Sequence, residues 1–373
     1  MTLIALDARL TRQMSVGMKT YVEEVVRRLP AAAPELEFLA VSNAKFDLDE
    51  PNVKHLPISE AIAANGSLQE QSALPRVLGR CGASLIHYMS VYAPRRSRVP
   101  HVYTIHDLIH LRFPEQFSWK VPPYYRFVVR PVAATARSVI TDSQATVADL
   151  QAFLGVRPER VRVIPLGVAE SFRLSDEQRS AHAARAAQSF ALERPYFVYA
   201  GNHRAHKNLG TLIGAWRLLA APCDLVITGE GAARPQLGAT PKPGGRVLLT
   251  GHVRVEDLLA LYAGCVAAVQ PSLYEGFGLS VLEAMAAGAP VIIARTPALV
   301  DVGGDCVLSF TPTDESSLAS LMAAVLKDDR LAARLRDGGR KRAAQYSWDL
   351  TARRTADVYR EAVADVGLAK TKT

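Results

Sequence analysis

Two glutamates, Glu275 and Glu283, flank a glycine-rich turn whose chemistry suits an anionic, hydroxyl-bearing ligand. An apolar run ends at about Gln270, the loop Glu275-Gly-Phe-Gly278 follows, and residues 279–287 favour a helix. The glycines let the backbone approach a phosphate closely, and the helix start offers free N–H groups to an anion. One carboxylate then lies at the helix mouth and the other about a turn inside. Two acceptors so spaced would hold two sets of hydroxyls on one elongated ligand. A tight turn with a charge stabilised by the helix dipole explains one glutamate but not both.

A second candidate site segment, Gly201 to Leu209, ends another apolar run and opens a helix. Arg204 and Lys207 lie there, although the positive end of a helix dipole disfavours cations. A bound anion is the natural reason to place them at this point. The alternative is a solvated basic loop.

His106 also follows an apolar run and is a further candidate. Its i, i+4 spacing from His110 suggests a metal pair, but a strand end is not a continuous helix and no Glu completes an H-E-x-x-H motif. A metal bound through oxygen ligands commonly needs a pair such as Asp-x-Asp, and the Asp47-Leu-Asp49 pair lies in a polar loop. We therefore predict no metal site. The alternative for His106 is a histidine hydrogen-bonded at a strand end.

The elements that must position these residues are short apolar runs that alternate with helical segments, a pattern typical of parallel sheets covered on both faces. Twelve such runs exceed one sheet of normal size, whereas six per sheet give two doubly wound domains. The predicted strands are Leu3–Leu6, Phe38–Val41, Leu85–His87, Val102–Ile105, Val139–Thr141, Val161–Ile164, Tyr196–Tyr199, Leu225–Thr228, Val247–Thr250, Val266–Gln270, Val291–Ala294 and Val307–Phe310.

The chain of 373 residues is long enough for two domains, and we place the hinge near residues 165–175. The first domain is predicted to span 1–170 and the second 171–349. A last helix, 350–373, is expected to pack back on the first domain, with residues 366–373 as a frayed tail.

Composition restricts the class of protein. The chain has 44 Lys and Arg against 36 Asp and Glu, a net charge of +8, and this excess suits an anionic small substrate, an anionic membrane or nucleic acid alike. Four dispersed cysteines argue against a zinc ribbon or a disulfide framework. The first strand lacks the basic start of a signal peptide, and residues 258–274 are interrupted by Gly264, Gln270 and Pro271, which argues against a membrane span. We expect a soluble, cytoplasmic protein.

Several segments taken in order closely resemble the retaining nucleotide-sugar glycosyltransferases of family 4. The Glu-x7-Glu pattern is followed by Ala-Met-Ala-Ala-Gly-Ala-Pro-Val-Ile292. The other matching segments are Ser15-Val-Gly17, Thr104-Ile-His-Asp107, Thr141-Asp-Ser143, Val163-Ile-Pro-Leu-Gly167, Ala200 to Leu209 and Thr250-Gly-His-Val253. The resemblance covers nearly the whole chain and implies the GT-B architecture, two doubly wound α/β domains facing across a cleft, with the acceptor side in the first and the donor site in the second.

The resemblance also implies roles for individual residues. Glu275 would hold donor-sugar hydroxyls and Glu283 the ribose diol, while His106 would lie near the transferred sugar and acceptor. Lys207 and Arg204 would grip the donor diphosphate, although His206 stands in the usual basic position. Ser280 stands where most members have Pro, and Ser143 is at least as well explained as a helix N-cap. The implied catalytic residues are His106, Glu275, Lys207 and Arg204, and the implied donor-binding residues are Gly17, Val253, Gly276, Phe277, Gly278, Leu279, Ser280 and Glu283.

The implied reaction moves a hexose from a nucleotide diphosphate sugar to a hydroxyl of a glycan or lipid-linked glycan, with retention, in cell-surface polysaccharide synthesis. Mannose and GDP-mannose are favoured, because the His-Asp-Leu-Ile and Thr-Asp-Ser segments look most like bacterial O-antigen mannosyltransferases. Retaining glycosidases use a carboxylate nucleophile, but the family points to front-face attack assisted by the donor phosphate. The resemblance implies no cofactor, no required metal and no nucleic-acid partner.

Other functions stay open. A UDP-hexose-dependent transferase and a catalytically silent nucleotide-sugar-binding regulator of the same fold both fit the motifs. A dinucleotide oxidoreductase and a P-loop ATPase are disfavoured, because neither G-x-G-x-x-G nor G-x-x-x-x-G-K-[ST] occurs at a strand end.

Basic residues of the first domain suggest a peripheral contact with an anionic membrane at its inner face, with a solvated basic face as the alternative. The cations are Arg76, Arg80, Arg95, Arg96, Arg98, Arg126 and Arg130, and the nearby aromatic residues are Trp119, Tyr124 and Tyr125.

Overall fold

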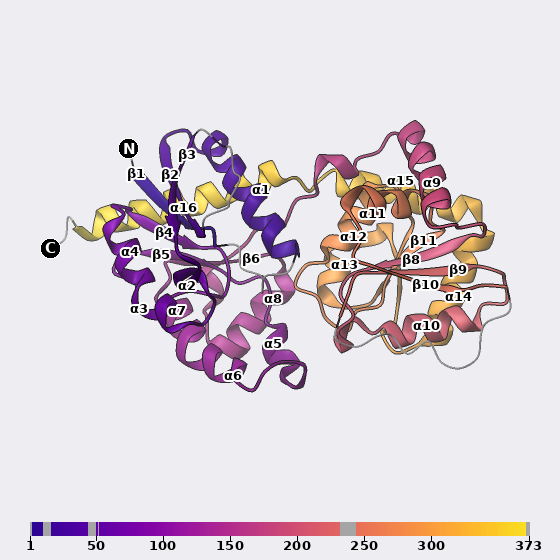
Figure 1. The fold of residues 1–373 in the computed structure, drawn as a ribbon, viewed down its shortest axis with the longest axis horizontal. Coiled ribbons are helices and arrows are strands. Elements are labelled where there is room, and N and C mark those ends of the chain that lie inside the picture. Colours follow the sequence, from indigo (N-terminus) through magenta and orange to yellow (C-terminus); the bar gives the residue numbers. More distant parts are fainter. Residues whose placement is uncertain (1, 10–15, 44–49, 51, 232–243, 371–373) are drawn as a thin grey trace. The chain divides into compact units, whose positions relative to one another are not determined.

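The computed structural model describes residues 2–9, 16–43, 50, 52–231 and 244–370, and the chain divides into two compact units (Figure 1). Unit 1 comprises Met1–Gly167 and Ser347–Thr373, and unit 2 comprises Val168–Tyr346. The domain limits predicted from the sequence were 170 and 349. Each unit is a parallel sheet covered by helices, so the predicted α/β fold class is confirmed.

The sheet of unit 1 has the strand order β3-β2-β1-β4-β5-β6-β7 in the described residues, and every neighbouring pair is parallel. All six runs predicted in this half overlap a strand. The strands are β1 (Thr2–Asp7), β2 (Leu36–Asn43), β3 (Val53–Ile58), β4 (Leu85–Tyr88), β5 (His101–Thr104), β6 (Ser138–Thr141) and β7 (Val161–Val163).

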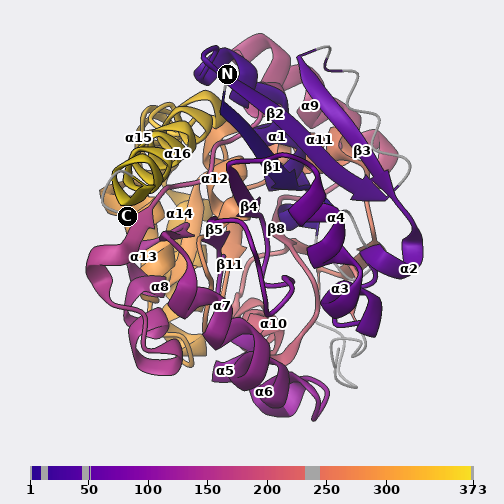
Figure 2. The same ribbon diagram turned by 90° about the vertical axis from the view of Figure 1, so that its left-hand side faces the viewer.

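Helices cover both faces of this sheet, and Figures 1 and 2 show α16 on one face and α3 and α4 on the other. Helix α16 packs against α1 and also contacts β4 and β5, although it is the last element of the chain. The helices of unit 1 are α1 (Val16–Ala32), α2 (Glu60–Ala63), α3 (Leu68–Ser72), α4 (Leu74–Arg80), α5 (Ile109–Arg112), α6 (Val121–Tyr124), α7 (Arg130–Thr135), α8 (Gln144–Asp149) and α16 (Trp348–Lys370).

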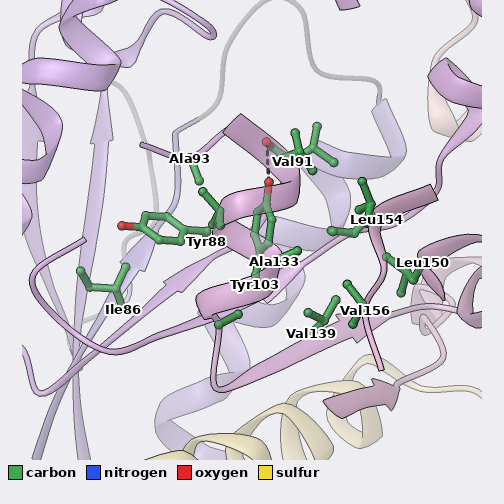
Figure 3. Close-up of a cluster of buried hydrophobic side chains, with 14 of the residues drawn as sticks. Ile86, Tyr88, Val91, Ala93, Tyr103, Ala133, Val139, Leu150, Leu154 and Val156 are labelled. Atoms are coloured by element: carbon green, nitrogen blue, oxygen red, sulfur yellow. Dashed lines mark hydrogen bonds between the residues drawn. The ribbon is translucent and has the colours of Figure 1, made fainter. Parts of the chain in front are cut away.

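The core on the α4 and α7 face is built from alternate strand residues, since successive side chains of a strand point to opposite faces. Tyr88 of β4 and Tyr103 of β5 are fully buried there, and the Tyr103 hydroxyl donates to the Val91 carbonyl at 2.7 Å (Figure 3). Leu150 and Leu154 close the cluster from the helical turn after α8. The buried phenol therefore keeps a hydrogen bond while its ring fills the core.

The sheet of unit 2 has the order β10-β9-β8-β11-β12-β13 in the described residues, again with parallel pairs throughout. All six runs predicted here overlap a strand. Its strands are β8 (Tyr196–Ala200), β9 (Asp224–Thr228), β10 (Val247–Gly251), β11 (Ala267–Gln270), β12 (Val291–Ala294) and β13 (Leu308–Phe310), and its helices are α9 (Asp176–Ser189), α10 (Leu209–Leu218), α11 (Val255–Gly264), α12 (Leu279–Ala286), α13 (Pro297–Gly303), α14 (Glu315–Lys327) and α15 (Asp329–Ala343).

The structure differs from the sequence prediction at three places. Strand β3 was not predicted, because its residues Val53-Lys-His-Leu-Pro-Ile58 lie at a sheet edge, where only Ile58 is buried and Pro57 is tolerated. The segment predicted as a frayed tail, 366–373, is helical through Lys370. Gly17 lies inside the first turn of α1 and not in a loop before it.

Residues where the chain leaves and re-enters unit 1 are in contact. A Cβ on Gly167 would lie 2.1 Å from the backbone nitrogen of Trp348, so no larger residue fits. The Thr351 hydroxyl donates to the Pro165 carbonyl at 2.8 Å. These contacts fix the start of α16 against the end of the first chain segment.

Candidate functional site

The switch point of the unit 2 sheet lies between β8 and β11, which are neighbours although they are not consecutive in the chain. On either side of this point the chain winds outward in opposite directions. In such sheets ligands bind at the carboxyl ends of the strands beside the switch point. Lys207 lies in the loop after β8 and Glu275 in the loop after β11, so the two predicted site segments meet here.

Glu275 accepts three hydrogen bonds on one carboxylate oxygen. Lys207 Nζ donates to its Oε1 at 2.6 Å, and Gln270 Nε2 and Ser272 Oγ each donate at 2.7 Å. Burial opposes ionisation of this carboxyl, but the Lys207 charge and the three donors hold its pKa below the ordinary value. Glu275 is therefore an ionised, fixed acceptor at neutral pH, with a side chain 13% exposed.

Lys207 is held in place by a loop that is tied to the Glu275 loop. It ends the short 3-10 turn Ala205–Lys207, and Asn208 follows in the left-handed conformation with φ of 57°. Asn208 Nδ2 donates to the carbonyls of Pro271 and Pro312 at 3.1 and 2.6 Å. In the structure Lys207 thus pairs with Glu275, whereas the sequence analysis predicted that it would bind a diphosphate.

The second predicted cation, Arg204, is exposed three residues before Lys207 in the same loop. His206, which stands in the usual basic position, is buried at 2% exposure. Its carbonyl accepts from the Leu273 N–H at 2.8 Å and so joins the two loops. His206 is therefore a structural residue here, and the assignment of Arg204 to the diphosphate stays a prediction.

The first turn of α12 follows the Glu275 loop directly. Gly278 precedes the helix with φ of 108°, and a Cβ there would lie 2.7 Å from Leu299 Cδ2. Only glycine fits this conformation and this space. The N–H groups of Leu279 and Ser280 follow at the first turn, where a helix has no internal partner for them. This geometry suits an anion, as predicted for Gly276, Gly278, Leu279 and Ser280.

Two further predicted donor-binding residues differ in what they can offer. The Phe277 side chain is 5% exposed and packs edge-on against Tyr346, with ring centroids 6.0 Å apart. Its ring is thus part of the core, so Phe277 can contribute only its backbone to a ligand. Val253 lies half-buried in the turn between β10 and α11.

Glu283 lies half-buried in α12, one turn beyond the helix head. Burial raises the pKa of its carboxyl to about 8, and among the described residues no cation pairs with it. Glu283 is accordingly protonated at neutral pH in the unliganded protein. The two glutamates of the motif therefore carry different charges, although both were expected to be ionised acceptors.

In unit 1, His106 follows β5 and pairs with Asp142, which follows the adjacent strand β6. The His106 Nδ1–Asp142 Oδ2 distance is 2.8 Å, and Tyr21 of α1 packs edge-on against the imidazole at 4.6 Å. Burial disfavours the imidazolium, yet the Asp142 charge and hydrogen bond raise the pKa of His106 above its ordinary value. Nε2 of His106 is buried, and the nearby Met89 backbone also favours the protonated ring.

Two other candidates of unit 1 have structural roles that the sequence left open. Ser143 accepts from the Thr146 N–H at 3.4 Å and caps α8, which favours the N-cap interpretation. Gly17 is the second residue of α1, so it would approach a phosphate from a helix start and not from a closing loop. Ser15 lies outside the described residues.

Carboxylates at the strand ends have partners of their own. Asp7 pairs with Arg9 at 2.6 Å, and Asp107 Oδ1 accepts from the Ile109 N–H at 3.0 Å. His110 Nδ1 and the Tyr125 hydroxyl share a hydrogen bond of 3.1 Å. No cluster of three or more potential metal ligands occurs in the described part of the chain, and Asp47-Leu-Asp49 lies outside it.

On the surface predicted to face a membrane, the cations are exposed, but the aromatic residues differ in exposure. All seven arginines named for it are exposed, and Trp119 is 79% exposed. Tyr125 is buried at 3%, because its ring faces the core of unit 1, whereas Phe127 is 56% exposed. No helix among the described residues has the length and apolarity needed to span a membrane.

Three contributors to these arrangements escaped the sequence analysis. Gln270 and Ser272 complete the donors to Glu275, and Asp142 pairs with His106. Asp142 stood in a segment noted for its resemblance, and its place after a strand beside that of His106 was the available signal. Gln270 ends an apolar strand, so its polar side chain was the signal there.

Comparison with protein-family models identifies both halves of the chain. The model described as "Glycosyltransferase Family 4" matches residues 16–172, and the model described as "Glycosyl transferases group 1" matches residues 181–342.

Named relatives are similar over much of the chain. The MMP alpha-(1->4)-mannosyltransferase of Mycolicibacterium hassiacum is 31% identical over 66% of this chain and 61% of that protein, so the chain spans less than two thirds of that relative. The O-antigen chain mannosyltransferase B of Escherichia coli is 26% identical over 92% of this chain and 96% of that protein.

Solved structures share the fold. Sucrose-phosphate synthase from Thermosynechococcus elongatus superposes with a TM-score of 0.75 at 21% identity, covering 98% of this chain and 100% of that one. The Anabaena protein Alr3699/HepE, solved in complex with UDP-glucose, superposes with a TM-score of 0.74 at 18% identity, covering 97% and 100%. The matches of both halves, with these relatives and this fold, establish that the chain belongs to the family 4 glycosyltransferases of GT-B fold.

Proposed function

We infer that this enzyme transfers a hexose from a nucleotide diphosphate sugar to a hydroxyl of a glycan or lipid-linked glycan, with retention, in the synthesis of a cell-surface polysaccharide. The observation that best supports this proposal is the ionised Glu275, which Lys207 holds in place beside the start of α12 at the switch point of the sheet. The mannosyltransferases among the relatives favour mannose as the sugar and GDP-mannose as the donor.

Glu275 is suited to hold donor-sugar hydroxyls. An ionised carboxylate is acceptor-only and can take hydroxyl donors on Oε2, while Oε1 is engaged by Lys207, Gln270 and Ser272. A carboxylate whose pKa is lowered by an ion pair is a weaker nucleophile. This arrangement supports positioning of the sugar over covalent attack on it.

Charge develops on the diphosphate as it leaves the sugar. Lys207 and the N–H groups of Leu279 and Ser280 supply fixed positive potential on one side of the loop, and they need no reorganisation during the reaction. Arg204, exposed in the same loop as Lys207, is the second cation of this proposal. In unit 1, Asp142 orients His106 through Nδ1, and we assign His106 to the sugar and acceptor side.

Substitution of Glu275 tests the proposed function. Glu275→Ala and Glu275→Gln should each lower transfer from labelled GDP-mannose by about a hundredfold or more, as loss of an electrostatic site group does, while donor binding survives in weakened form. The matched control is Glu256→Gln, an exposed carboxylate in the first turn of α11. Transfer by the Glu275 variants within about tenfold of the wild type would remove Glu275 from the site.

The same assay separates the other functions. Transfer from a UDP-hexose in place of GDP-mannose would identify the UDP-dependent enzyme. Donor binding by the wild type with neither transfer nor slow donor hydrolysis would identify the silent regulator.

Nucleotide binding should release a proton through Glu283. Its carboxyl, with a pKa of about 8, is protonated at pH 7, whereas ribose hydroxyls that donate to it favour the ionised form and lower that pKa. Affinity should therefore rise as pH approaches 8 and level off above it. Calorimetry at pH 7 in buffers of different ionisation enthalpy measures the release.

The matched variant for this measurement is Glu283→Gln, which keeps the shape but cannot titrate. It should bind nucleotide without proton release and with a raised donor KM, and Glu283→Ala should raise the KM as well. An unchanged donor KM in both variants would contradict the ribose role.

Transfer should need no divalent metal, because Lys207 and the helix amides supply the positive potential that a metal would otherwise provide. Activity should persist in excess EDTA, and Lys207→Ala should lose most of it. The control is Lys327→Ala, at the end of α14. Activity lost in EDTA and restored by Mg²⁺ or Mn²⁺ would overturn this account.

A peripheral encounter with anionic lipid is proposed for the surface around α6 and α7. Trp119 and Phe127 are exposed there together with Arg126 and Arg130, and each cation near such a surface contributes about 1 kcal/mol. The protein should co-sediment with anionic vesicles at low salt, and Trp119→Ala/Phe127→Ala should weaken this. The control Leu68→Ala removes an 85% exposed apolar side chain from α3. Equal recovery with neutral vesicles, or none with anionic ones, would favour a merely solvated face.

A further inference from the structure

A hollow of about 540 Å³ opens in unit 1 at the amino ends of the strands. Its charged and polar lining comprises Arg95, Arg98, Arg137, Arg160, His101, Ser97 and Thr135. No carboxylate of the described residues lines it. Four arginines therefore line one concave surface.

The position of the hollow separates it from the proposed transfer chemistry. Arg137 immediately precedes β6 and donates its N–H to the carbonyl of His101, the first residue of β5, while Arg160 immediately precedes β7. His106 and Asp142 lie beyond the opposite ends of β5 and β6. The four residues of β5 hold the two edges about 13 Å apart.

The described part of the chain provides no ion pair for the arginines of the hollow. Among the described residues, none of its four arginines forms an ion pair, whereas the neighbouring Arg162 pairs with Glu361 and Arg112 with Asp149. Burial lowers the pKa of Arg160, and the charges of Arg157 and Arg137 lower it further. Like charges this close repel one another unless an anion joins them.

The walls are fixed by bonds to the backbone. Arg160 Nη1 donates to the Ala134 carbonyl at 2.9 Å. His101 is 5% exposed, and its Nε2 donates to the Val132 carbonyl at 3.1 Å. Both acceptors belong to α7, so Arg160 and His101 are held against this helix before a ligand binds.

We propose that this hollow, lined by Arg95, Arg98, Arg137 and Arg160, is a second anion-binding site that takes a compact phosphate-bearing group, such as a pyrophosphate, a phosphomonoester or a phosphate headgroup. Guanidinium groups bind phosphate oxygens in pairs of parallel hydrogen bonds, and several of them on one concave surface select a multiply charged ligand. The site does not depend on the proposed function of unit 2.

Calorimetric titration with pyrophosphate tests the proposal, in a Lys207→Ala background that removes the donor-site cation. Binding should persist in this background and weaken about tenfold or more in Arg137→Ala/Arg160→Gln, because the variant loses charged hydrogen bonds to the phosphate oxygens. The matched control, Arg353→Ala/Arg354→Ala, removes the same charge from an exposed part of α16. The circular dichroism spectrum and Tm of each variant establish that it is folded.

A second arm identifies the source of the phosphate. Vesicles containing phosphatidic acid should be bound by the wild type in competition with pyrophosphate if a lipid headgroup enters the hollow. That binding should then fall more in Arg137→Ala/Arg160→Gln than in the Arg353→Ala/Arg354→Ala control. Pyrophosphate binding without such competition assigns the site to a soluble phosphate compound. No pyrophosphate binding in the Lys207→Ala background, or equal weakening in the Arg353→Ala/Arg354→Ala control, would overturn the proposal.

Discussion

The ion pair between Lys207 and Glu275 is the interaction on which the geometry of the unit 2 site depends. A carboxylate that is 13% exposed loses most of its hydration, and this loss is tolerable only when a cation and hydrogen-bond donors replace the water. Lys207, Gln270 and Ser272 replace it on a single oxygen. Because Lys207 follows β8 while Gln270 and Ser272 belong to β11 and its loop, the pair also couples two chain segments. The carbonyl of His206 and the side chain of Asn208 reinforce the same connection.

Parallel strands explain why such distant residues meet. Every strand of the unit 2 sheet has its carboxyl end at one edge, and the switch between β8 and β11 lies at that edge, where such sheets bind their ligands. The two glutamates of the Glu-x7-Glu motif therefore lie in different environments, Glu275 in the loop and Glu283 in the helix that follows. Glu275 has a cation and Glu283 has burial alone, so their pKa values move in opposite directions. Such divergence is what assigns one carboxylate a fixed charge and lets the other respond to a ligand.

The apolar strands could be predicted from the sequence, because a strand buried on both faces is a continuous apolar run. The residues at the strand ends could be predicted as well, because parallel strands place their carboxyl ends at one edge of the sheet. The sequence was insufficient for β3, whose edge position leaves Lys54 and His55 exposed and its pattern mixed. It was also insufficient for side-chain direction. Phe277 stands between two glycines of a binding motif, yet its ring packs on Tyr346, a residue 69 positions further on that only tertiary structure brings close. Likewise Tyr125 belongs to an amphipathic run, but its hydroxyl reaches His110 within the fold.

The same reasoning explains why the last helix belongs to unit 1. Tyr359 of α16 is fully buried, and its hydroxyl hydrogen-bonds His87 Nδ1 at 2.6 Å, while His87 Nε2 bonds the Thr104 hydroxyl at 2.7 Å. Burial lowers the pKa of His87 to about 3, so this histidine is neutral and each ring nitrogen needs a partner of its own. Thr104 in turn bonds Tyr21, whose ring packs against His106. A buried polar chain is favourable only when every member is satisfied. Helix α16 therefore does more than cover apolar surface: it completes the polar layer on which the imidazole of His106 rests.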